Sequence, residues 1–197
     1  MPNPWNERFA GDEFAYGTEP SDFLAEHVGL LTGPVLSLAE GEGRNAVFMA
    51  SRGLDVVAVD SSDVGLAKAS RLAAERGVAI ETVVADLSDY EMPRDHFGAV
   101  VSIWAHVPGK LRKTLHGAVA NALKPGGIIL LEAYAKGQLG RGTGGPSDPD
   151  RLMSCEALEQ EFPGCEPILS REIEREVVEG HLHAGLSEVV QFIARKT

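Results

Sequence analysis

Short apolar runs alternate with stretches of helical spacing along most of the chain. The apolar runs fall at residues 35–38, 55–60, 78–85, 97–104 and 128–133, and they are typical of strands buried on both faces of a parallel sheet. Helical spacing or capping residues mark 22–31, 46–50, 63–76, 109–123 and 154–162. This alternation predicts right-handed βαβ units built around one sheet.

The pattern changes after residue 134. Residues 137–149 hold five glycines and two prolines, so we expect 135–150 to form a glycine-rich substrate flap. Two strand-like segments, 168–178 and 187–194, flank a polar turn and predict a closing antiparallel hairpin, whose loop projects at the edge that carries the cofactor loops. The predicted fold is α/β: a Rossmann-like, seven-stranded, mostly parallel sheet with one antiparallel strand and helices on both faces.

Length and composition predict one domain over residues 1–197, with residues 1–21 as an N-terminal arm or lid. The sequence has no apolar run near the ~20 residues that a membrane span needs, and its start does not resemble a signal peptide, so we expect a cytoplasmic protein without a membrane partner. Cys155 and Cys165 suit two reduced thiols. The net charge of −11 argues against nucleic acid as a partner and favours a small-molecule substrate, for a monomer or homodimer.

A Gly-x-Gly turn links the first apolar run to the helix at 46–50, which is how a doubly wound domain begins its cofactor site. Glu40 and Glu42 flank Gly41 in this turn, and both carboxylates would repel a pyrophosphate. S-adenosylmethionine has no phosphate and carries a cationic sulfonium and ammonium. The acidic turn therefore favours S-adenosylmethionine as the cofactor.

Two aspartates follow the next strands. Asp60 ends the second strand, 60 − 43 = 17 residues beyond Gly43, where a carboxylate accepts hydrogen bonds from ribose hydroxyls. Asp86 ends the third strand, where it accepts from an adenine amino group. Both residues also suit structural roles, as a helix cap and a loop aspartate.

The turn, the two aspartates and Leu-Lys-Pro-Gly-Gly at 123–127 resemble the class I S-adenosylmethionine-dependent methyltransferases over about residues 22–134. Residues 13–20 and 41–45 are similar to a small bacterial branch that includes tellurite-resistance-type methyltransferases. Two positions depart from the family: Ser37 replaces the usual first-strand acidic residue, and Ala39 replaces the first glycine. The resemblance implies cofactor contacts from Ala39, Glu40, Gly41, Gly43, Arg44, Asn45, Asp60, Ser61, Asp86, Leu87 and Trp104.

Methyl transfer is an in-line displacement, in which the protein positions the reactants and excludes water. A general base is needed only for a protonated acceptor, and His106, just after the fourth strand, is the candidate. Trp5 and Tyr16 in the arm, and Tyr134 before the flap, are candidate lid or substrate residues. His181 and His183 alternate beside Glu179 and Glu174, but without a convincing third ligand we expect a solvated hairpin tip and no metal.

We therefore expect an S-adenosylmethionine-dependent methyltransferase that acts on a small-molecule nucleophile, such as a chalcogen oxyanion or a thiol. Two alternatives stay open at this point. A NAD(P)-dependent oxidoreductase would have Ala46 in place of the third glycine of its fingerprint. A non-catalytic protein that binds S-adenosylmethionine or a partner would use the same fold.

Overall fold

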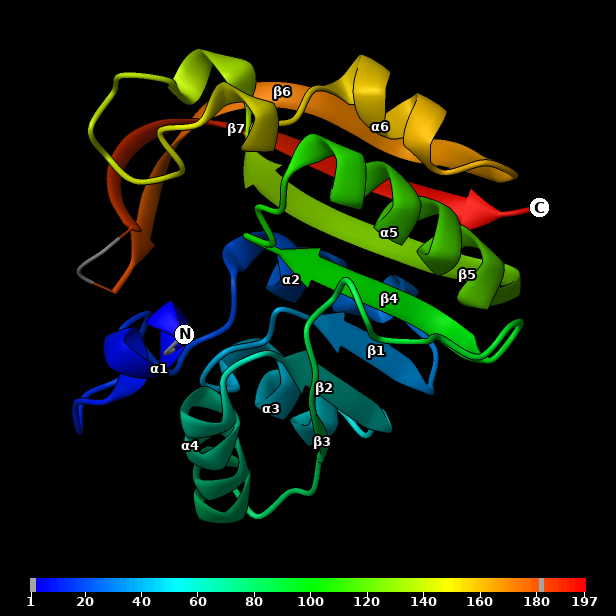
Figure 1. Cartoon of the computed structure of the whole chain (residues 1–197). Helices are drawn as coiled ribbons and strands as arrows, with labels where there is room; N and C mark the ends of the chain where they lie inside the picture. The colour runs from blue at the N-terminus through cyan, green and yellow to red at the C-terminus, as the bar shows by residue number, and fades with distance from the viewer. Residues whose placement is uncertain (1–2, 181–182) are drawn as a thin grey trace.

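The computed structural model describes residues 3–180 and 183–197. Its centre is a seven-stranded sheet of order β3-β2-β1-β4-β5-β7-β6 (Figure 1). The strands are β1 (Val35–Leu38), β2 (Val56–Asp60), β3 (Glu81–Val84), β4 (Phe97–Ile103), β5 (Leu123–Tyr134), β6 (Cys165–Glu179) and β7 (His183–Lys196). Only β7 runs antiparallel, against both β5 and β6, so β6 enters its hairpin parallel to the first five strands. The predicted fold is confirmed.

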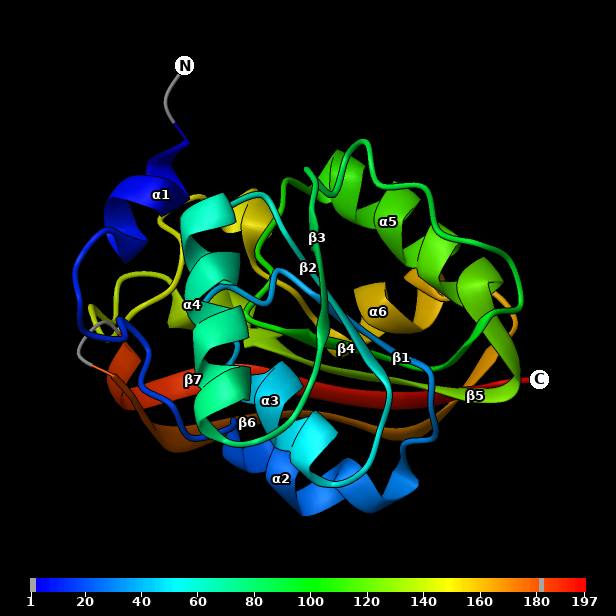
Figure 2. The ribbon, with the colours of Figure 1, turned by 90° about the horizontal axis from the view of Figure 1, so that it is seen from below.

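Helices cover both faces of the sheet (Figures 1 and 2). The helices are α1 (Pro4–Phe9), α2 (Asp22–His27), α3 (Arg44–Ser51), α4 (Asp63–Glu75), α5 (Gly109–Ala122) and α6 (Cys155–Glu161), with 3₁₀ turns η1 (Val28–Leu30), η2 (Lys136–Gln138) and η3 (Pro149–Arg151). One apolar cluster joins α5 and α6 to the sheet, and another joins α2, α3 and α4 to the opposite face. Neighbouring residues such as Leu130 and Leu131 fall in different clusters, because successive strand side chains point to opposite faces.

Several predicted elements have different bounds in the structure. β3 is shorter than predicted, whereas both hairpin strands are longer and β5 begins at Leu123. The predicted helix at 22–31 ends at His27 and continues as η1. The predicted N-terminal arm contains a helix that the sequence pattern did not indicate, α1, whose start is capped by Asn3 with Pro4 in the first turn.

The carboxyl ends of the parallel strands lie at one edge of the sheet, where ligands bind in open α/β folds. α1 and the segment between β5 and α6 lie near this edge (Figure 1). Among the described residues, no helix combines the length and the apolar character that crossing a membrane requires.

Candidate active site

A cavity of about 630 Å³ opens at this edge of the sheet, between the ends of β1, β2 and β4. Its wall contains most of the site residues predicted from the sequence: Trp5, Tyr16, Ala39, Glu40, Gly41, Arg44, Asn45, Asp60, Ser61, Asp86, Leu87, Trp104 and His106. The fold therefore brings residues from six separate stretches of the chain to one place. Their contacts with a cofactor remain predictions.

Gly43 and Tyr134 are the two predicted residues that do not line this cavity. Gly43 has a φ of 96°, and a Cβ there would lie 2.6 Å from the Cα of Ala69, so this glycine allows α3 to pack closely on α4. Tyr134 is fully buried behind the wall, with its ring 4.5 Å from Trp104 and 5.4 Å from His106 between centroids. Tyr134 supports these two rings instead of forming the predicted substrate surface.

Glu40 lies beside Ser37 and is hydrogen-bonded to it. Its carboxylate accepts hydrogen bonds from the Ser37 hydroxyl and from the backbone N–H groups of Asn45 (3.1 Å) and Ala46 (2.9 Å) at the start of α3. Burial raises the pKa of Glu40, against the lowering effect of these hydrogen bonds and of Arg44. Glu40 thus supplies a carboxylate next to β1, where Ser37 stands in place of the usual acidic residue.

Glu42 does not face the cavity. Its carboxylate forms a buried ion pair with Lys68 (2.7 Å) and accepts the backbone N–H of Ala15 (2.8 Å). The expected repulsion of a pyrophosphate by two acidic side chains was therefore wrong for Glu42. Only Glu40 contributes an acidic side chain of this turn to the cavity wall.

Ala39 adopts the left-handed backbone conformation, with a φ of 51°. This conformation costs about 1–2 kcal/mol for a residue with a Cβ, while glycine loses about 0.5–1 kcal/mol more backbone entropy on folding. Ala39→Gly should therefore raise the free energy of unfolding by about 0.5–1 kcal/mol, measured by urea denaturation. A lower free energy of unfolding would show that the Ala39 methyl group contributes packing that outweighs the strain.

Asp60, the last residue of β2, is hydrogen-bonded to the glycine turn that follows β1. Its carboxylate accepts the backbone N–H groups of Gly41 (2.9 Å) and Ser62 (2.8 Å), and Ser62, not Asp60, caps α4. Burial raises the pKa of Asp60, while both backbone donors act in the opposite direction. An ionised carboxylate has about four acceptor positions, so two N–H donors leave room for hydroxyl groups.

Asp86 lies on an exposed loop next to Leu87. Its Oδ1 accepts both the backbone N–H (2.8 Å) and the hydroxyl (2.7 Å) of Ser88. These two bonds lower the pKa of Asp86, so its carboxylate is ionised at neutral pH.

The N-terminal helix α1 docks on the loop between β2 and α4. The Asn3 amide donates to the carbonyl of Ser61 (2.7 Å), and Asn6 exchanges hydrogen bonds with Ser62 (2.6 Å) and Asp63 (2.7 Å). Phe9 is buried against Gly41. This docking brings Trp5, Arg8 and Phe9 to the wall of the cavity.

Trp104 follows β4 with a φ of 61°, a conformation that a bulky residue rarely adopts. Its backbone N–H donates to the carbonyl of Glu132 (2.9 Å), and its indole N–H donates to the Glu179 carboxylate. Glu179 also binds Arg44 through an ion pair. The hairpin strand β6 thereby holds two residues of the cavity wall, one from α3 and one from the end of β4.

Behind this contact lies a buried charge network. Arg175 donates from Nε to Oε1 of Glu132 and from Nη2 to Oε2, both at 2.9 Å, and reaches Glu179 at 3.2 Å. Gln191 and Ser21 also donate to Glu132, whose side chain has no exposed surface. Two arginines, counting Arg44, thus balance two buried carboxylates.

His106 lies on the cavity wall, but one of its ring nitrogens is committed. Nε2 accepts the backbone N–H of Tyr134 at 3.0 Å, so the neutral ring carries its hydrogen on Nδ1. The Nε2 lone pair is then engaged by the Tyr134 N–H, and Nδ1 already carries a hydrogen, so neither nitrogen is placed to take a proton. The predicted general-base role therefore requires this hydrogen bond to break.

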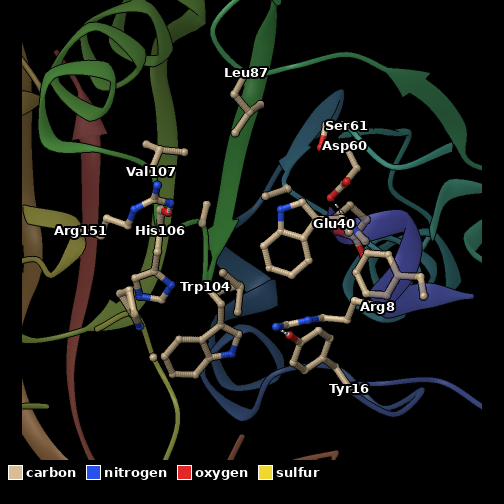
Figure 3. A pocket seen from close by; sticks show the side chains of 18 of the residues that line it. Arg8, Tyr16, Glu40, Asp60, Ser61, Leu87, Trp104, His106, Val107 and Arg151 are labelled. Carbon is tan, nitrogen blue, oxygen red and sulfur yellow. Dashed lines mark hydrogen bonds between the residues drawn. The ribbon is translucent and has the colours of Figure 1, made fainter. Parts of the chain in front are cut away.

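Sequence reasoning missed the cavity residues around His106, above all Arg151 in η3, with Val107, Pro108 and Leu111. Figure 3 shows His106, Val107 and Arg151 on one side of the cavity and Glu40, Asp60 and Ser61 on the other. Arg151 directly follows the glycine-rich segment, and the one feature of the sequence that could have indicated it is a basic residue next to the predicted flap.

The hairpin tip was considered above as a metal or acceptor site. There, His181 lies outside the described residues, and Glu174 forms an ion pair with Arg141.

The donor set fits S-adenosylmethionine. Glu40, Asp60 and Asp86 place three carboxylates along the cavity wall, in keeping with a cationic ligand that carries hydroxyl and amino groups. Two arginines lie on the same side: Arg44 is paired with Glu179, and Arg8 donates to the Tyr16 hydroxyl. Among the described residues, no group of histidine, cysteine or acidic side chains is suited to hold a metal ion.

Comparisons with known proteins find similarity to methyltransferases. Residues 35–127 match a family described as a methyltransferase domain. A curated relative from Mycobacteroides abscessus, 2-heptyl-1-hydroxyquinolin-4(1H)-one methyltransferase, is 28% identical over 128 residues, which cover 62% of this chain and 56% of the relative. The chain thus spans little more than half the length of this curated relative.

Solved structures share the fold over most of the chain. The structure described as "Conversion of a Disulfide Bond into a Thioacetal Group during Echinomycin Biosynthesis" has a TM-score of 0.77 at 20% identity, covering 97% of this chain and 87% of that one. TehB from Haemophilus influenzae has a TM-score of 0.73 at 17% identity, covering 89% of this chain and 62% of that one. The chain is therefore similar to methyltransferases over residues 35–127, and it shares the fold of these solved structures over most of its length.

Proposed function

We propose that this protein transfers a methyl group from S-adenosylmethionine to a small-molecule nucleophile. The observation that carries this proposal is the single cavity wall on which Glu40, Asp60 and Asp86 meet at the carboxyl edge of the sheet. When bound, S-adenosylmethionine supplies an electrophilic methyl group on a cationic sulfur. The remaining cavity wall, around His106, is then available for the methyl acceptor.

Within this proposal, each of the three carboxylates binds a different part of the cofactor. Asp60 accepts hydrogen bonds from the ribose hydroxyls, beside the Gly41 N–H that orients it. Asp86 and Leu87 bind the adenine, and Glu40 faces the cationic methionine end. Ala39, Asn45 and Ser61 complete the cofactor wall.

The arm and the flap close the cavity in this proposal. Trp5, Tyr16 and Gly145 belong to its wall, and Arg8 of α1 donates to the Tyr16 hydroxyl at 2.9 Å. Both segments therefore lie where they exclude water during methyl transfer.

The acceptor classes to test include thiols, chalcogen oxyanions and N-hydroxy heteroaromatics. The first two come from the predicted family branch, and the third from the compound for which the Mycobacteroides abscessus relative is named. The size of the cavity, about 630 Å³, falls within the range of about 300–1,000 Å³ for small-molecule sites.

The test combines binding with transfer. Calorimetry should show that S-adenosylmethionine and S-adenosylhomocysteine bind and that NAD does not. A labelled methyl group should then move from S-adenosylmethionine to at least one member of the acceptor panel. Binding without transfer to any acceptor class would favour a non-catalytic cofactor-binding protein, and preferential NAD binding would overturn the proposal.

The role of Glu40 gives a sharper expectation. Glu40→Gln should weaken the binding of S-adenosylmethionine by about three- to tenfold more than that of S-adenosylhomocysteine, because only the former carries a sulfonium charge. Calorimetry on both ligands measures this difference. Glu42→Gln is the matched control, since Glu42 faces Lys68, and should leave the ratio of the two affinities unchanged. Equal losses for both ligands in Glu40→Gln would show that Glu40 does not sense the sulfonium.

A further inference from the structure

The acceptor side of the cavity carries a fixed cation. Arg151 ends η3, and its Nη1 donates to the backbone carbonyl of His106 at 3.2 Å. In Figure 3, Arg151 lies beside His106 and Val107, across the cavity from Glu40 and Asp60. Three carboxylates and Arg8, which donates to the Tyr16 hydroxyl, line the cofactor side, whereas Arg151 is the charged side chain beside His106 on the acceptor side.

The charge of Arg151 is only weakly compensated. Asp148 is the acidic partner that the described residues offer within 4 Å, at 3.8 Å from Nε, and the two side chains are 41% and 55% exposed. Exposed pairs of this kind contribute little binding energy. The neighbouring Asp150 carboxylate instead accepts the backbone N–H of Gly109 at 2.7 Å. Arg44 shows the opposite situation, because buried Glu179 neutralises it.

The state of His106 bears on the same question. With Nε2 accepting from Tyr134, the ring does not accept the proton that a neutral O–H, N–H or S–H acceptor must lose. An acceptor that arrives already ionised needs no base. A guanidinium near the reacting group favours that ionised form.

We propose that the methyl acceptor binds as a small organic anion, with its charge beside Arg151 and its apolar body against Val107, Pro108 and Leu111. This inference rests on the proposed function and names its substrate class. The anion's lone pair forms the new bond to the methyl carbon, while the electron pair of the methyl–sulfur bond returns to sulfur. A neutral methylated product and S-adenosylhomocysteine result, and no proton is released.

The test measures the binding of two planar probes, benzoate and its neutral analogue benzamide, to the protein saturated with S-adenosylhomocysteine. Arg151→Gln should lower benzoate affinity about tenfold and change benzamide affinity less than about twofold, because only benzoate forms the charge-assisted contact. Arg151→Lys keeps the charge and should retain most of the benzoate preference. S-adenosylhomocysteine affinity should be the same in all these variants.

Two matched variants control for electrostatics at a distance. Asp148→Asn removes the competing carboxylate but keeps the Oδ1 that caps η3, and should tighten benzoate binding about twofold. Arg94→Gln makes the same charge change on an exposed loop before the amino end of β4, and should leave both probes unchanged.

The outcomes separate this inference from the proposed function. Failure of S-adenosylhomocysteine to bind would count against the proposed function itself. Normal S-adenosylhomocysteine binding with no benzoate binding, or with equal losses of benzoate and benzamide in Arg151→Gln, would overturn only the anionic-acceptor inference. A loss of transfer in His106→Gln that is confined to protonated acceptors would likewise overturn it, by showing that the histidine acts as a base.

Discussion

Arg175→Leu is expected to lower the free energy of unfolding by about 3–5 kcal/mol, because it leaves a buried carboxylate without its counter-charge. Glu132 has no exposed surface, and both of its oxygens accept hydrogen bonds from Arg175. Urea denaturation at neutral pH measures the loss. Arg195→Leu, on an exposed position of neighbouring β7, is the matched control and should change the free energy of unfolding by less than about 0.5 kcal/mol.

The cost of Arg175→Leu should also depend on pH. Burial already raises the pKa of Glu132 in the native protein, and Arg175 lowers it. Removing Arg175 raises the folded-state pKa further above its unfolded value, so the variant loses stability as pH rises through that pKa. The difference from the native protein should therefore be smaller at about pH 5 than at about pH 8. A loss that is the same at both pH values, or equal to that of Arg195→Leu, would show that Arg175 acts through packing alone.

Replacement of Asp60 should give the largest loss of cofactor affinity. Asp60→Ala removes a bidentate, charge-assisted contact to two ribose hydroxyls, which is worth about 1.5–3 kcal/mol or roughly 10- to 150-fold in the dissociation constant. Calorimetry with S-adenosylhomocysteine measures this loss directly.

Because Asp60 also holds the N–H groups of Gly41 and Ser62, a second variant separates binding from support of the turn. Asp60→Asn keeps an acceptor for one N–H, but loses the charge, and should still bind several-fold more weakly. Asp55→Ala, just before the opposite end of β2, controls for a general effect on the strand. Unchanged affinity in folded Asp60→Ala would refute the ribose assignment.

The parts of the site that follow local rules were predictable from the sequence. An apolar run that ends in a Gly-x-Gly turn fixes where a strand stops and a helix begins, and Asp60 marks the next strand end by position alone. The carboxyl ends of parallel strands meet at one edge, so Glu40, Asp60, Asp86 and Trp104 were expected to converge there. Each inference needed only residues near one another in the chain, together with one rule of topology.

Other features depend on contacts between distant segments, which no local pattern encodes. Glu179 reads as part of a polar hairpin tip, yet it binds Arg44, which lies 135 positions earlier in the chain. Tyr134 lies between an apolar strand and the glycine-rich flap, and only the packing of Trp104 and His106 against its ring shows that it is buried. The direction of the Glu42 carboxylate depends on Lys68, one helix further on.

Trp5 and Trp104 are the only tryptophans in the chain, and both line the cavity. Tryptophan emission from this protein therefore originates entirely at the site, without background from indoles elsewhere in the fold. The two fluorophores also occupy different parts of the wall, one on the N-terminal helix and one beside His106. A single Trp→Phe exchange in either position would leave one optical reporter, so that movement of the arm and filling of the acceptor side are followed separately, without an attached dye.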